Sequence, residues 1–83
     1  MDTGKFKNKS YRDLQIEGRN TASIVKALSN EIRIQILELL DKQEMNIQSI
    51  QKQINLSKTT VLMHLKILEK AGFISTHYVP GTV

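Results

Sequence analysis

In this 83-residue chain, the side chains best suited to chemistry are the hydroxyl and ammonium groups at the start of a helix-forming segment that begins at Ser57. Lys58 and Thr59 follow directly, and Lys66 lies further along the same segment. Ammonium groups bind phosphate oxygens or the acceptor atoms of guanine, and hydroxyl groups can donate to either. The backbone N–H groups at a helix start also attract anions. The pattern indicates a surface for a polyanion; the plainer alternative is a capping serine followed by solvated lysines.

Catalysis and metal binding find little support in the same sequence. The chain has no cysteine, which excludes thiol nucleophiles, thiolate zinc sites and disulfides. His64 has no serine or aspartate partner at a motif spacing, and His77 is the one other histidine that could join it in a metal site. We therefore interpret His64 as a packing or hydrogen-bonding residue, and we expect no enzyme activity, no metal and no cofactor.

Length, composition and charge narrow the class of protein further. Eighty-three residues can form one small domain, and no apolar run of about 18 residues predicts a membrane span. Residues 57–70 hold three lysines against one glutamate, whereas residues 31–41 hold three acidic residues against one arginine. A domain polarised in this way suits a polyanion on one face. The lack of cysteine and of a predicted membrane span favours a cytoplasmic protein without a membrane partner.

Periodicity predicts four helices and one strand after the first 19 residues. Apolar residues recur at spacings of three and four in the helical segments, as expected for helices with one buried face. These segments are residues 22–28 (capped by Thr21), 31–40, 47–54 and 57–71. Residues 73–79 alternate in the manner of a strand. Residues 1–19 lack sustained periodicity, and we interpret them as a flexible basic tail.

Local signals define the ends of the predicted helices. Good N-cap residues precede the last three, namely Asn30, Asn46 and Ser57. Asn55 tolerates the left-handed conformation that a tight turn between helices needs, and Gly72 is placed to end the last helix. The third and fourth helices therefore have the spacing of a helix-turn-helix.

In a helix-turn-helix, the first helix crosses the DNA backbone and the second enters the major groove. The second predicted helix turns Val61, Leu65 and Leu68 toward the core. The residues left to face DNA are Ser57, Lys58, Thr59, Leu62, Met63 and Lys66. Leu62 and Met63 offer apolar contacts, for example to thymine methyl groups, and the lysines, including Lys70, would neutralise phosphates.

Two stretches of the chain resemble the ArsR family of bacterial winged-helix transcriptional regulators. ALSNEIRIQILELL, residues 27–40, is similar to the opening pattern of the family. SKTTVLMHLKILEKAGFI, residues 57–74, is similar to its recognition helix. The family often has a serine and an arginine or glutamine where this chain has Leu62 and Met63. It also places a thiolate metal site on a helix that lacks cysteine here, so the resemblance does not extend to metal sensing.

The resemblance implies a mainly α fold with a small β-wing: a winged helix-turn-helix of three to four helices plus an incomplete β-hairpin. It also implies a homodimer that binds a palindromic operator. We expect a tail over residues 1–19 and a DNA-binding domain over residues 20–83. Because strand 73–79 has no predicted partner, we expect the domain to be truncated at the wing and to belong to a longer regulator.

The predicted function is sequence-specific binding of double-stranded DNA by a bacterial transcriptional regulator, acting as a repressor. Residues 57–71 would enter the major groove. The alternative is a winged-helix module that binds other proteins and not DNA. That alternative predicts no salt-sensitive binding to a duplex and no loss of binding when Lys58 and Lys66 are replaced by alanine.

Overall fold

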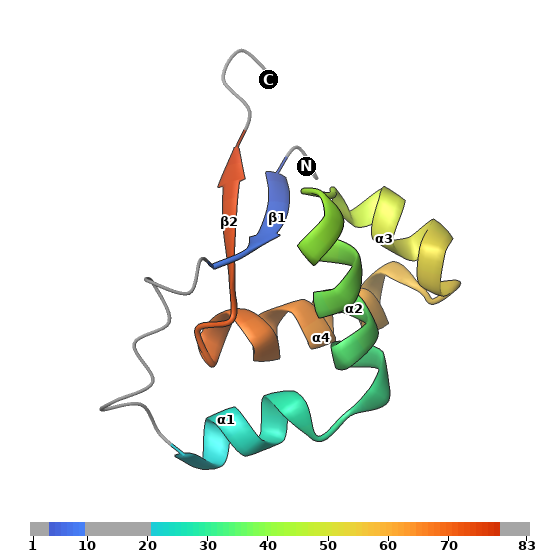
Figure 1. The fold of residues 1–83 in the computed structure, drawn as a ribbon. Coiled ribbons are helices and arrows are strands. Elements are labelled where there is room, and N and C mark those ends of the chain that lie inside the picture. Colours follow the sequence, from blue (N-terminus) through green and yellow to red (C-terminus); the bar gives the residue numbers. More distant parts are fainter. Residues whose placement is uncertain (1–3, 10–20, 79–83) are drawn as a thin grey trace.

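Amphipathic helical segments and one pair of short strands build the fold in the computed structural model, which describes residues 4–9 and 21–78 (Figure 1). The elements are β1 (Gly4–Asn8), α1 (Thr21–Leu28), α2 (Glu31–Lys42), α3 (Ile47–Ile54), α4 (Lys58–Lys70) and β2 (Ile74–Tyr78). The prediction of a mainly α winged helix-turn-helix is confirmed, although α1 begins at Thr21 rather than after it. None of these helices has the length and hydropathy of a membrane span.

Side-chain oxygens cap three of the four helices for which the sequence predicts caps. The Asn30 Oδ1 atom accepts a hydrogen bond from the Ile32 N–H at 2.8 Å. Asn46 and Ser57 each accept from the N–H three residues later, at 2.8 and 3.2 Å. These bonds satisfy donors that a helix start leaves without a partner inside the helix, so they determine where α2, α3 and α4 begin.

Two left-handed residues end α3 and α4, as the sequence predicts. Asn55 has φ 63° and ψ 48°, and its N–H donates to the Gln51 carbonyl at 2.7 Å. Gly72 has φ 88°, and its N–H donates to the Glu69 carbonyl. The N–H of the next residue, Phe73, donates to the Leu68 carbonyl. This paired pattern ends α4 and turns the chain sharply into β2.

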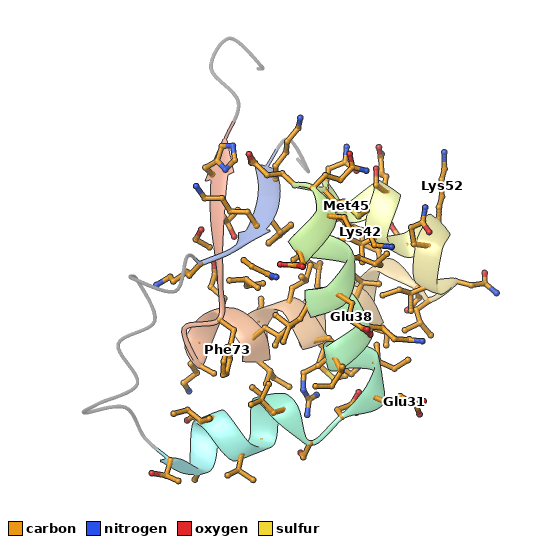
Figure 2. All side chains as sticks on the ribbon, in the orientation of Figure 1. Glu31, Glu38, Lys42, Met45, Lys52 and Phe73 are labelled. Carbon is orange, nitrogen blue, oxygen red and sulfur yellow. The ribbon has the colours of Figure 1, made fainter. Side chains whose placement is uncertain are left out.

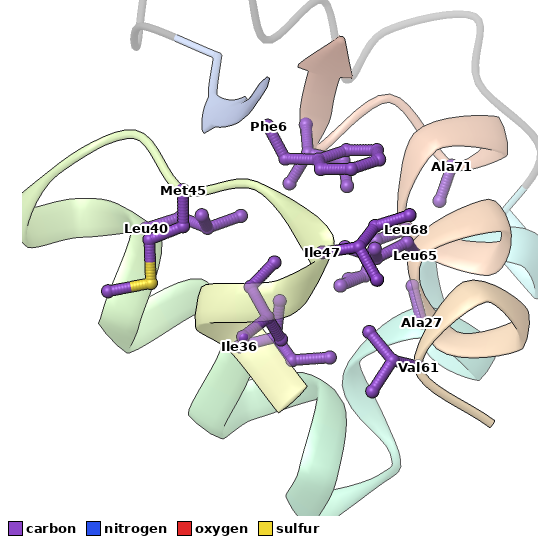
Figure 3. Packing of buried hydrophobic residues seen from close by; sticks show 12 residues of the cluster. Phe6, Ala27, Ile36, Leu40, Met45, Ile47, Val61, Leu65, Leu68 and Ala71 are labelled. Atoms are coloured by element: carbon purple, nitrogen blue, oxygen red, sulfur yellow. The ribbon is translucent and has the colours of Figure 1, made fainter. Parts of the chain in front are cut away.

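One hydrophobic core joins all the elements (Figure 3). Its largest fully buried side chains are Ile36, Ile50, Val61, Leu65, Leu68 and Ile74. Phe6 of β1, Ala27 of α1 and Met45, before α3, complete its edges. The leucine stripe of α4 therefore anchors this helix to the body of the domain, as its spacing predicts.

The N-terminal strand β1 lies where the sequence predicts a flexible tail. Residues 4–8 are not a flexible tail, because they pair antiparallel with β2, with Phe6 opposite Thr76. On its other side, the Phe6 backbone exchanges two hydrogen bonds with Met45, at 2.8 and 3.1 Å. β1 thus lies between Met45 and β2. Its sequence, GKFKN, has too few apolar residues for a periodic signal, because its pairing is with residues far along the chain.

The wing strand β2 therefore has a partner, and among the described residues this partner is β1, from the N-terminal part of the chain. The prediction that this strand lacks a partner within the chain is wrong for that reason. The rest of the predicted tail, together with the end of the predicted strand at Val79, lies outside the described residues.

Candidate nucleic-acid interface

Helices α3 and α4 form the helix-turn-helix, with α4 crossing behind α2 in Figure 1. α3 buries Ile47 and Ile50, and α4 buries the leucine stripe described above. The Gln51 side chain donates to the Leu56 carbonyl at 3.5 Å and so supports the turn between the two helices. With one face of each helix packed in the core, their opposite faces are left for a partner molecule.

The structure brings the predicted DNA-facing residues together on α4 and at its N-cap. Ser57, Lys58, Thr59 and Lys66 are exposed, and Met63 keeps 49% of its surface accessible. Leu62 differs, because it is half-buried and packs against the core. The exposed positions from Ser57 to Lys66 form what we call the α4 surface.

The first turn of α4 is held by its own hydroxyl groups. The Ser57 hydroxyl donates to the Thr60 hydroxyl at 2.9 Å and accepts from the Thr60 N–H. Ser57 is therefore an N-cap, as the plainer alternative for this residue stated. The cap also holds the first turn of α4 in place, so that the positive end of the helix dipole, next to Lys58 and Thr59, faces solvent.

Two further candidate residues lie on α3 and are missing from the predicted set. Gln48 and Lys52 are exposed, and Lys52 projects away from the body of the molecule (Figure 2). Their spacing of four residues places them on one side of α3, away from its isoleucine stripe. That spacing is visible in the sequence and could have identified them, since the first helix of this motif crosses the DNA backbone.

His64 is on the buried side of α4, not on the α4 surface. It is 5% exposed, and its Nδ1 atom lies 3.1 Å from Nη1 of Arg33, which is itself buried. Burial lowers the pKa of His64 below its usual value of 6.5, and the neighbouring Arg33 charge lowers it further. The interpretation of His64 as a packing and hydrogen-bonding residue is confirmed.

Polar contacts connect β2 to α4 and to the segment between α2 and α3. The Thr76 hydroxyl donates to the Glu69 carboxylate at 2.7 Å, and His77 pairs with Glu44 at 2.9 Å. On the outward face of the sheet, Lys5 and Lys7 are exposed and lie opposite His77 and Ser75. Within the part of the chain that the structure describes, no group of three or more histidine or acidic side chains is placed to hold a metal ion.

Comparison with known proteins gives a consistent set of relatives. The family model described as "Bacterial regulatory protein, arsR family" matches residues 30–76. The uncharacterized HTH-type transcriptional regulator MJ0229 of Methanocaldococcus jannaschii is 43% identical over 53 residues, which is 64% of this chain and 56% of that protein. No solved structure gives a significant match.

Two other relatives have names that state opposite effects on transcription. The transcriptional repressor SdpR of Bacillus subtilis is 38% identical over 66% of this chain and 61% of its own length. The transcriptional activator HlyU of Vibrio cholerae is 32% identical over 86% of this chain and 68% of its own length. This chain thus matches only about three fifths of the length of the first two relatives.

Proposed function

This chain belongs to the ArsR family of bacterial regulatory proteins, and we propose that it binds double-stranded DNA through α4 as part of a transcriptional regulator. The α4 surface carries this proposal. It presents two lysines, two hydroxyl groups and an apolar side chain opposite the buried leucine stripe, within a helix-turn-helix. The major groove admits one helix, and base edges meet the residues that face away from the protein core.

The side chains of this surface divide into two roles. Lys58 and Lys66 neutralise phosphates, which supplies affinity without sequence information. Thr59 can bond a base edge or a phosphate, and Met63 offers an apolar contact to a thymine methyl group. The half-buried Leu62 contributes less to this contact than its position in the sequence predicts. Lys52 and Gln48 of α3 are placed to meet the backbone that this helix would cross.

We further propose that two copies act together on a palindromic operator in the cytoplasm and that binding represses transcription. The two-fold symmetry of a dimer matches that of a palindrome. Repression would follow where the operator overlaps a promoter, because the bound protein would then occupy that site sterically. The names of the relatives include a repressor and an activator, so a transcription assay with the operator upstream of a reporter decides the sign.

A salt titration tests DNA binding directly. Replacing both Lys58 and Lys66 by alanine should reduce the slope of log K against log salt concentration by about two units, one per lost phosphate contact. Lys42→Ala, an exposed lysine at the end of α2, is the matched control and should leave the slope unchanged. Binding to selected duplexes is measured by fluorescence anisotropy.

The two candidate functions give different outcomes in this experiment. A DNA-binding regulator shows salt-sensitive binding that the double variant weakens. A module that binds only proteins shows no salt-sensitive duplex binding in any variant. Equal slopes for the wild type and the double variant would remove the two lysines from the phosphate contacts.

A further inference from the structure

Arg33 and His64 form a buried polar contact that the proposed DNA surface does not use. Arg33 is 6% exposed and His64 is 5% exposed, and 3.1 Å separates Nη1 from Nδ1. The other two nitrogen atoms of the Arg33 guanidinium group donate to backbone carbonyls at the end of α1: Nε to Ala27 at 3.1 Å and Nη2 to Lys26 at 2.6 Å. One side chain of α2 thus holds α1 and α4 together.

The chemistry of this contact requires a neutral imidazole. A guanidinium group has five N–H donors, no acceptor, and stays protonated in proteins. The Nδ1 atom of His64 must therefore accept, with the ring proton on Nε2. A protonated imidazole would instead direct an N–H at the guanidinium and place two positive charges side by side in a buried site.

Within the described part of the chain, no acidic side chain pairs with the imidazole of His64. Arg33 is the charged group that shifts the pKa of His64, and it acts in the same direction as burial. On the α1 side, the Arg33 guanidinium group contacts the two carbonyl oxygens already named. The other charged groups of the elements packed against His64 are exposed: Lys26, Glu31, Glu38, Asp41, Lys42, Lys52, Lys58, Lys66, Glu69, Lys70 and His77.

We propose that the Arg33–His64 contact is a pH-sensitive clamp. With His64 neutral, the clamp holds the middle of α4 against α1 and α2 in the position that the duplex requires, and protonation of His64 releases it. His64 directly follows Met63 of the α4 surface, so a shift of the buried side moves the exposed side. The proposal rests on the proposed function, because the clamp positions α4 for DNA and does not itself contact DNA.

The sign of the pH effect follows from the direction of the pKa shift. The pKa of His64 is lower in the folded chain than its ordinary value of 6.5, so the unfolded chain takes up the proton more readily. The contribution of His64 to stability is therefore fully present above pH 6.5 and is lost as the pH falls through the folded pKa. DNA affinity should fall over the same interval.

The test follows DNA affinity from about pH 7.5 down to the lowest pH at which the chain stays folded, because the pKa of His64 lies below the ordinary histidine value. Wild-type affinity should fall about tenfold, as for the loss of one hydrogen bond to a charged group. His64→Asn keeps an acceptor near the Nδ1 position without titrating, so its affinity should stay constant. His77→Gln, which removes the exposed histidine, should fall like the wild type. A wild-type affinity that is constant, or an equal fall in His64→Asn, would overturn the clamp.

A second measurement does not depend on DNA or on the folding of a variant. ¹⁵N spectra of the wild-type imidazole should show an unprotonated Nδ1 and a protonated Nε2 at neutral pH. The stability of the wild type to urea should decrease on acidification over the same interval. A proton on Nδ1, or a titration at the ordinary value, would overturn the clamp. If no duplex binds while these spectra match, the proposed function fails and the buried contact stands.

Discussion

Single residues determine where several helices of this domain begin and end, and Gly72 is the clearest example. Its φ of 88° lies in the left-handed region, and the residue is buried between α4 and β2. A valine there must adopt a conformation that its branched Cβ disfavours, and it must also fit into a packed site. The conformational freedom of glycine is therefore needed at this position.

We expect Gly72→Val to lower the free energy of unfolding by more than about 1–2 kcal/mol, the cost of a left-handed residue with a Cβ atom. Urea denaturation measures this value. Asn55→Gly is the matched control, because it places glycine at the other left-handed position and should change stability little, since glycine reaches this region without a Cβ penalty. A Gly72→Val variant as stable as the wild type would contradict the left-handed assignment.

Residues that act through neighbours in sequence were predictable, and residues that act over long distances were not. Asn46 and Asn55 determine the ends of α3 through bonds to residues three or four positions away, so a local pattern predicts them. Arg33 lies in a stretch of apolar residues, and its partners come from α1 and α4. No local pattern in α2 indicates that its arginine is buried.

The same distinction holds for whole elements, where β1 is the main departure. The helices have buried stripes long enough to be visible in the sequence, whereas β1 contributes one large apolar side chain, Phe6. Its stability depends on pairing with β2, about 70 positions further along the chain, and with Met45, about 40 positions further along. The candidate α4 surface was predictable because it is the reverse side of a periodic stripe; the half-burial of Leu62 was not, since it depends on tertiary packing.

We expect Phe6→Ala to lower the free energy of unfolding by about 3 kcal/mol, a typical cost for removing a buried phenylalanine ring. The loss is large for a domain of this size, whose total stability is on the order of 5–10 kcal/mol. Lys5→Ala, on the exposed face of the same strand, is the control and should stay within about 0.5 kcal/mol of the wild type. If urea midpoints of both variants equal that of the wild type, β1 does not pack against the domain in solution.

At the scale of the whole molecule, the domain offers one α4 surface, and a palindrome needs two. A single copy would bind a half-site with the modest affinity of a small, mostly electrostatic contact. Two copies joined in a dimer would bind the second half-site as an intramolecular event, which raises affinity without any new contact. Specific regulation by a domain this small therefore favours a dimeric arrangement.

The dimer proposal predicts a strict dependence on half-site spacing. Half-sites with centres about 34–36 Å apart, one DNA turn, present the same groove to both α4 helices. Inserting half a turn of DNA between them rotates one half-site to the opposite side, and affinity should fall by at least about a hundredfold as the second contact is lost. Inserting a full turn keeps the half-sites on one side and is the control for added length. Anisotropy titrations with the three duplexes, alongside sedimentation of the protein, check this. Equal affinity for the half-turn insertion and the original palindrome would show that each copy binds alone.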